Sequence, residues 1–219
     1  MRASSMQDKA EGALVGLAVG DALGTTVEFE PRGSFDPVTD IAGGGRFHLP
    51  RGAWTDDTSM ALCLAESLVE CGRFDLEDQL ARYVRWYREG HWSSTGACFD
   101  IGNTTRSALE SFEQTKKVSG GTEENSAGNG SIMRLAPVPI FYRHDLASAI
   151  FYSGESSTAT HALPICVDAC RLLGAMIAVA VNGGEKDDIL REPIPQDALR
   201  DTFHPQIASV VNGSWEGID

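Results

Sequence analysis

Apolar residues recur at helical spacing along most of the chain, and the alternation typical of β-strands is almost absent. This spacing predicts helices over residues 8–24, 55–72, 76–89, 103–114 and 162–181. Residues 132–143 show the same spacing, interrupted by Pro137 and Pro139. Asp75 and Gly90 are typical start and stop signals of the third helix. We therefore expect a fold that is mostly or wholly α-helical, with long glycine-bearing loops.

The first predicted helix has a glycine at every fourth position, so these glycines share one face. They are Gly12, Gly16, Gly20 and Gly24. A glycine inside a helix costs up to about 1 kcal/mol relative to alanine. The stripe therefore predicts close approach of another backbone or a ligand, and tight packing of a second helix is the simpler interpretation.

Two long loops are expected. Residues 31–54 are rich in Pro and Gly, and residues 116–131 contain "SGGTEENSAGNGS". Long loops without secondary structure inside a compact domain are usually functional or disordered.

Charge and composition exclude several classes of partner. The 219 residues include 18 Lys and Arg against 31 Asp and Glu, for a net charge of −13. Such a chain is not expected to bind nucleic acid or an anionic membrane. The five cysteines lack zinc-site spacing and read as reduced thiols, and the N-terminus lacks a signal peptide. Together these features predict a cytoplasmic location.

The stretch "WTDDTSM" places two adjacent carboxylates at the start of a helix. Thr55 can cap that helix, and the helix dipole favours Asp56 and Asp57 in its first turn. One side chain satisfies the capping requirement, so the second acid is surplus to it. Carboxylate and hydroxyl oxygens are the ligands of hard cations such as Mg²⁺, so a metal site is the alternative to a structural role.

Further polar blocks occur along the chain. "GDALGTTVEF" supplies Asp21 and Glu28, and "FDIGNTT" supplies Asp100 beside Gly102 and Asn103. "GNGSIMRLAP" is expected to be a loop whose backbone N–H groups point into the start of a helix, a common way to hold phosphate. "STATH" places His161 at a junction between loop and helix, where a structural role is the simpler explanation.

In this order, the blocks resemble the ADP-ribosylglycohydrolase family, whose enzymes remove ADP-ribose from modified proteins. The resemblance rests on "GALVGLAVGDALGTTVEF", "WTDDTSMAL" and "GNGSIMRLAPV", and it runs from about Gly12 to about Gly184. "FDIGNTTRSAL" is most similar to the branch that acts on ADP-ribosylated arginine, which includes dinitrogenase reductase-activating glycohydrolase.

The resemblance implies a compact, orthogonal all-α domain with a dinuclear Mg²⁺ or Mn²⁺ centre. Thr55, Asp56 and Asp57 match the first metal-binding motif. Glu28, Asp57 and Asp100 are the expected catalytic residues, with Asp100 suited to pair with a guanidinium. The expected substrate-binding residues are Gly102, Asn103, Asn129, Gly130, Ser131, Met133 and His161. The implied partner is an ADP-ribosylated protein or a small molecule that contains ADP-ribose.

The sequence departs from the family pattern near its end. The family's second acidic motif, Asp-x-Asp-Thr, does not occur after residue 188, and "KDDIL" at 186–190 does not fit it. We therefore expect residues 1–219 to form a single domain that is incomplete at its C-terminal side. The alternative is a binding module or pseudoenzyme that lacks half of the metal site. A helical interaction protein without a ligand is a third possibility.

Overall fold

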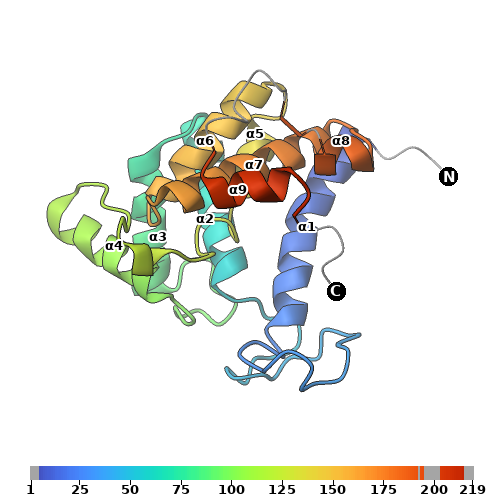
Figure 1. Ribbon diagram of the computed structural model, residues 1–219. Helices are drawn as coiled ribbons and strands as arrows, with labels where there is room; N and C mark the ends of the chain where they lie inside the picture. Colours follow the sequence, from blue (N-terminus) through green and yellow to red (C-terminus); the bar gives the residue numbers. More distant parts are fainter. Residues whose placement is uncertain (1–4, 192, 195–202, 215–219) are drawn as a thin grey trace.

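The computed structural model describes residues 5–191, 193–194 and 203–214 (Figure 1). The described residues contain no strand, only two isolated bridges, so the predicted all-α class is confirmed. The helices are α1 (Met6–Gly24), α2 (Asp56–Cys71), α3 (Leu76–Glu89), α4 (Asn103–Thr115), the 3-10 helix η1 (Glu124–Ser126), α5 (Pro137–Phe141), α6 (Leu146–Thr158), α7 (Pro164–Val181), α8 (Lys186–Arg191) and α9 (Pro205–Val211).

The helices pack in a connected series across the molecule. α2 contacts α1, α3 and α5, and α4 packs on α3. α5 also contacts the closely packed pair α6 and α7, and α9 lies on α7. The long segment between α1 and α2 forms loops at the lower end of both helices (Figure 1). The beginning of α2 therefore lies beside the end of α1.

Two apolar clusters hold the helices together. The larger joins α2, α3, α4 and α5, and its fully buried members include Met60, Leu64, Leu80, Tyr83, Trp86, Leu109 and Leu135. The smaller joins α6, α7 and α9 through Ile150, Leu172, Ala175, Ile194, Phe203 and Ile207.

Most of the capping residues that the sequence predicts lie at the ends of the observed helices. The Asp75 side chain accepts a hydrogen bond from Asp78 N at 3.1 Å, and Gly90 ends α3 with a φ of 69°. α2 ends at Gly72, whose φ is 64°. Such left-handed conformations suit glycine, which has no Cβ.

The helix predicted over residues 132–143 is wrong in its first part. Residues 131–134 form turns, and α5 begins only at Pro137. Proline fits a first helical position, where its missing N–H would have no partner in the helix. The sequence pattern also missed α6, which is capped by the Asp145 side chain through Ser148 N at 3.1 Å.

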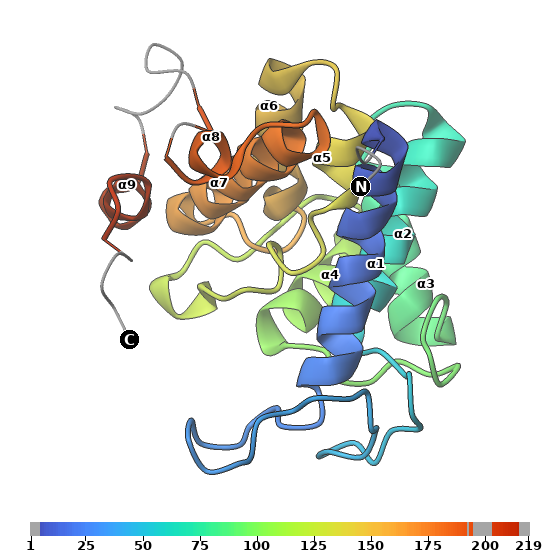
Figure 2. The ribbon, with the colours of Figure 1, turned by 90° about the vertical axis from the view of Figure 1, so that its right-hand side faces the viewer.

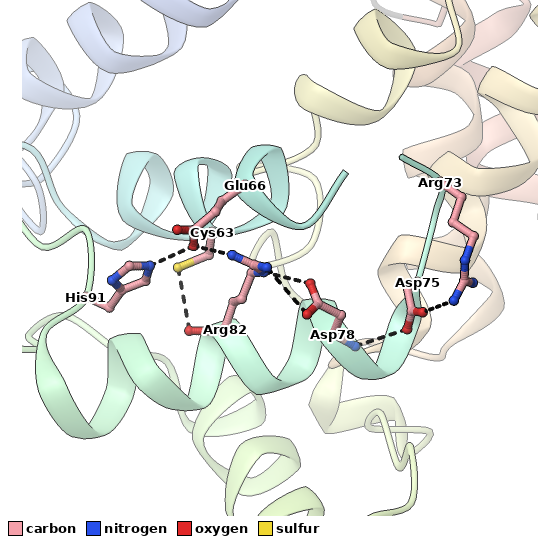
Figure 3. Close-up of polar contacts among 7 residues, drawn as sticks. All are labelled: Cys63, Glu66, Arg73, Asp75, Asp78, Arg82 and His91. Carbon is pink, nitrogen blue, oxygen red and sulfur yellow. Dashed lines mark hydrogen bonds and ion pairs between the residues drawn. The ribbon is translucent and has the colours of Figure 1, made fainter. Parts of the chain in front are cut away.

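A polar network fixes α2, α3 and the loop that follows α3 (Figure 3). Glu66 Oε2 on α2 lies 2.7 Å from Arg82 Nη1 on α3 and 2.7 Å from His91 Nε2. Burial disfavours the charge of Glu66, but hydrogen bonds from His91, Arg82 and Trp92 outweigh this effect and lower its pKa to about 2. This network anchors the loop that carries His91.

The anchored loop in turn holds the residue before the acidic motif. Trp54 Nε1 donates to Trp92 O at 3.1 Å, and Ser94 Oγ donates to Trp54 O at 2.6 Å. The loop that follows α3 therefore helps to fix the start of α2.

α1 lies at the surface with one long side uncovered (Figure 2). Ala22 is its one buried residue, whereas Val15 and Val19 are exposed. No described atom outside the helix lies within 4 Å of the positions that a Cβ would take at Gly12, Gly16, Gly20 or Gly24. The predicted close approach along the glycine stripe is therefore not made by the described residues.

α7 is the core helix that the sequence predicted. Within it, only Pro164 is exposed, and it packs along α6. By length and composition alone, α7 is the one helix among the described residues that could cross a membrane, a test that the core helix of a soluble protein also passes. The five cysteines are free thiols, as expected.

Candidate active site

A pocket with a volume of ≈ 280 Å³ collects most of the predicted site residues. Its lining comes from the α1–α2 loop, the start of α2, the start of α4, the loop before α5 and the junction of α6 with α7. The predicted residues that line it are Glu28, Asp56, Asp57, Asp100, Gly102, Asn103, Asn129, Gly130, Met133 and His161. Segments separated by more than a hundred residues in sequence, such as those of Glu28 and His161, therefore converge on one pocket.

Thr55 lies in a smaller hollow that adjoins this pocket, together with Asp21, Glu28 and Asp57. Its side chain makes no capping bond to α2, contrary to the sequence-based prediction. Asp21 of α1 takes that role: it accepts hydrogen bonds from Thr55 N at 3.0 Å, from Thr58 N at 3.1 Å and from both hydroxyl groups. Since Asp21 caps α2, Asp56 and Asp57 at its start are not needed as helix caps and are available for another role.

Asp56 is buried and Asp57 is half-buried, at a place where several acids repel one another. Burial raises the pKa of Asp56 to about 9, helped by the charges of Asp57, Asp100 and Asp21. Burial, with the charges of Asp21 and Glu28, raises the pKa of Asp57 to about 6. The helix dipole favours negative charge here, but it does not compensate for so many acids.

Glu28 and Asp100 form a pair of carboxyl groups across the pocket. Burial raises the pKa of both groups, and a hydrogen bond joins them, which requires a proton on one of the two. Asp100 has a φ of 58°, an uncommon conformation for a residue other than glycine. Such conformations often occur at functional sites.

The acids match the ligand chemistry of a hard divalent cation. The lining supplies carboxylate oxygens and, among the described residues, contains no Lys or Arg to neutralise them. In the described part of the chain, no three His, Cys, Asp or Glu side chains are already gathered around one point. The residues thus fit Mg²⁺ or Mn²⁺ in donor type and charge, with side chains that must turn toward the ion.

The opposite side of the pocket offers hydrogen-bond donors. α4 begins at Asn103 without a side-chain cap, and its first three residues line the pocket. Gly130, which faces them, makes no hydrogen bond to any described residue. Free backbone N–H groups at a helix start favour an anion such as phosphate.

The loop before α5 differs from its prediction in two ways. No helix begins there: Ile132 N and Met133 N both donate to Asn129 O at 3.0 Å, and residues 131–134 form turns. The Ser131 hydroxyl lies in the core, where it accepts hydrogen bonds from Ser157 Oγ at 2.8 Å and Cys170 Sγ at 3.5 Å. The helix start on this side of the pocket therefore belongs to α4.

His161 lies behind the same loop and is buried. A Cβ added to Gly130 would lie 2.8 Å from His161 Cε1 and 3.2 Å from Nε2, so only glycine fits there without movement. Burial and then the charge of Arg134 lower the pKa of His161 to about 4, which leaves the ring neutral.

Phe29 is a pocket residue that the sequence did not single out. The residue is 62% exposed, its φ is 68°, and the Arg46 guanidinium lies 5.0 Å from the ring centre. Phe47 contacts Phe29 edge to face at 6.2 Å and lies 5.4 Å from Phe99, next to Asp100. An aromatic rim therefore borders the acidic side of the pocket.

The structure is an all-α domain with one pocket between two walls. The acidic wall consists of Glu28, Asp56, Asp57 and Asp100, and the donor wall consists of the start of α4 and Gly130. Sequence comparison identifies the family to which this domain belongs. The chain belongs to the ADP-ribosylglycohydrolase family, whose sequence profile matches residues 2–216. Individual relatives and a solved structure give the same result.

The chain is 50% identical over 184 residues to the ADP-ribosylarginine hydrolase Tri1 of Pseudomonas putida (strain GB-1), covering 84% of this chain and 49% of that protein. It is 33% identical to the ADP-ribosyl-[dinitrogen reductase] glycohydrolase of Rhodospirillum rubrum, covering 84% and 61%. A solved structure titled "ADP-ribosylglycohydrolase-related protein complex" has a TM-score of 0.80 at 40% identity, covering 96% of this chain and 68% of that one. The chain thus spans about half the length of the ADP-ribosylarginine hydrolase.

Proposed function

We propose that this chain carries a large part of the active site of a metal-dependent hydrolase that removes ADP-ribose from modified arginine side chains. The observation that carries this proposal is the pocket itself, in which an acidic wall faces a wall of hydrogen-bond donors. The names of the two relatives above support the substrate class. A cytoplasmic location stays a prediction.

The donor wall is suited to the diphosphate of ADP-ribose. The uncapped start of α4 and the free Gly130 amide can donate to phosphate oxygens without any Lys or Arg in the lining. This agrees with an acidic protein that does not attract phosphate by its surface charge.

The acidic wall is suited to the ribose whose bond is cleaved. Asp56, Asp57 and Thr55 are the residues that would hold Mg²⁺ or Mn²⁺. When bound, the ion would neutralise the acids and orient the ribose hydroxyl groups.

Hydrolysis breaks the bond between the anomeric carbon and the arginine nitrogen, and water supplies OH to the carbon and a proton to the nitrogen. Asp57 or Glu28 orients the water and accepts its proton, and the neighbouring carboxylates stabilise positive charge on the sugar. Asp100 pairs with the guanidinium that leaves.

The number of bound metal ions tests this assignment. The acids of the pocket supply oxygens for one ion plus several waters, and a second ion would lack carboxylates of its own. We expect the 219-residue chain to bind at most one ion tightly and to be nearly inactive. A fusion to the segment that carries the second acidic motif of a longer relative should restore both properties.

Metal counting by native mass spectrometry, beside hydrolysis of an ADP-ribosylated arginine peptide, measures both properties. Two tightly held ions with rapid turnover in the 219-residue chain would contradict the one-ion prediction. Calorimetry with ADP-ribose, with and without Mg²⁺, completes the test. Binding without turnover in both proteins would show a binding module, and no binding in either would reject the function.

A further inference from the structure

Arg134 is a buried cation without an acidic partner. It has no exposed surface, and no described carboxylate forms an ion pair with it. Its guanidinium lies 4.5 Å from the centre of the Tyr83 ring, and its Nε has no hydrogen-bond partner. Burying an unpaired charge is strongly unfavourable, so this arrangement indicates a role beyond packing.

The hydroxyl group of Thr160 connects Arg134 to the pocket residue His161. Arg134 Nη2 donates to Thr160 Oγ1 at 2.8 Å, and Thr160 Oγ1 lies 2.8 Å from His161 Nδ1. A guanidinium is only a donor, so the Thr160 oxygen must accept from it. The single hydroxyl hydrogen is then free to point to His161.

This sequence of donors determines which nitrogen of His161 carries the proton. If Nδ1 were protonated, Thr160 would accept twice and its own hydrogen would have no described acceptor. With Nδ1 as the acceptor, the Thr160 hydroxyl both accepts from Arg134 and donates to His161, and the proton of the neutral ring lies on Nε2.

We propose that Arg134 and Thr160 are positioning residues that fix His161 as the neutral tautomer protonated on Nε2, so that it presents an N–H donor to a bound anion. Nε2 lies 3.5 Å and 3.2 Å from the positions that a Cβ would take at Gly128 and Gly130. The donor therefore joins the backbone N–H groups of Gly130 and the α4 start. Naming the acceptor as an oxygen of ADP-ribose rests on the proposed function, whereas the tautomer does not.

The buried guanidinium has a second consequence. It disfavours a second proton on His161, in agreement with the lowered pKa, so the ring donates one proton and stays uncharged. Its field also acts through a medium of low polarity, where charges are less screened than in water. The donor wall thus gains positive potential without a cation that could pair with the carboxylates opposite.

The tautomer is measured directly by long-range ¹H–¹⁵N correlation spectra of the ¹⁵N-histidine-labelled chain, with the His161 signals assigned by His161→Gln. We expect the neutral, Nε2-protonated pattern in the wild type near pH 7. Thr160→Val keeps the shape but removes the hydroxyl, so we expect a mixture of tautomers. Thr158→Val is the matched control, since its hydroxyl donates to Glu155 O and does not contact His161.

Affinity for ADP-ribose, measured by calorimetry on the same proteins, is the second readout. One lost hydrogen bond predicts an affinity roughly tenfold lower for Thr160→Val and unchanged for Thr158→Val. Arg134→Lys, which keeps the charge but not the planar fork, should also disturb the tautomer. Circular dichroism verifies that each variant is folded.

A wild-type His161 protonated on Nδ1, or a Thr160→Val spectrum identical to the wild type, would overturn the proposal. If no protein binds ADP-ribose but the tautomers change as expected, the positioning role stands and the proposed function fails.

Discussion

The acidic wall and the donor wall of the pocket differ in the charge that their groups carry. On the acidic wall, Asp56 and Asp57 lie so close to Asp21, Glu28 and Asp100 that burial and repulsion raise their pKa values. On the donor wall, α4 and Gly130 offer neutral N–H groups, and the guanidinium of Arg134 is buried behind Thr160. The first wall suits a cation and the second suits an anion.

This difference shows how an acidic chain can hold a ligand that is itself anionic. Negative groups are confined to one side, and the other side uses helix dipole, backbone amides and a neutral imidazole in place of exposed lysines. A ligand with a diphosphate at one end and a ribose diol at the other matches this order of groups. Substitutions in the acidic wall and substitutions in the donor wall should therefore have different effects.

The largest effect is expected on the acidic wall. Asp56→Ala and Asp57→Ala should each abolish metal-dependent hydrolysis in the longer fusion enzyme, because the ion loses its carboxylates. Helical content should stay nearly unchanged, since α2 is capped by Asp21. Turnover of an ADP-ribosylated arginine peptide and circular dichroism measure the two quantities.

Asp21→Ala is the matched variant for this prediction. It removes the cap and should lower the free energy of unfolding by about 1–2 kcal/mol. A parallel loss of helical signal and activity in Asp56→Ala and Asp57→Ala would show that these acids are structural, and the contrast between the walls would then lose its basis.

An intermediate effect is expected at Asp100. Asp100→Asn keeps the shape but removes the charge that we assign to the guanidinium, so it should lower activity on arginine-linked substrates more than on serine-linked ones. The ratio of kcat/KM for the two substrates, in wild type and variant, is the measurement. An unchanged ratio would remove Asp100 from leaving-group selection and leave it only as the partner of Glu28.

The sequence predicted those parts of the molecule that depend on local signals. Asp75, Gly72 and Gly90 delimit helices because capping acts over a few residues. The cap of α2 was not predictable in this way, since Asp21 comes from another helix 34 residues before Thr55. The sequence placed Ser131 in the binding loop but could not show that its hydroxyl turns into the core.

The uncovered side of α1 shows what a sequence pattern cannot predict. Its glycine stripe indicated a close neighbour, and the described residues provide none. A periodic pattern shows that a face is suited to packing, but it does not show what packs there.

The smallest effect is expected at Glu66, a carboxylate of α2 that belongs to neither wall. Unlike Asp56 and Asp57, it forms an ion pair with Arg82 and a hydrogen bond with His91, and its pKa falls to about 2. Glu66→Gln should leave hydrolysis unchanged in the longer fusion enzyme. It should lower the free energy of unfolding of the 219-residue chain by about 1 kcal/mol at pH 7, as expected for a single, partly exposed ion pair.

The pH dependence of this loss follows from the lowered pKa. Glu66 stabilises the fold above its ordinary pKa of 4.5, and this contribution disappears as the pH falls through about 2. The stability difference between wild type and Glu66→Gln should therefore shrink as the pH falls below 4.5. Urea unfolding at pH 7, 5 and 3 measures it. A difference that grows at low pH would mean that the carboxylate is repelled rather than paired, as the acids of the pocket are.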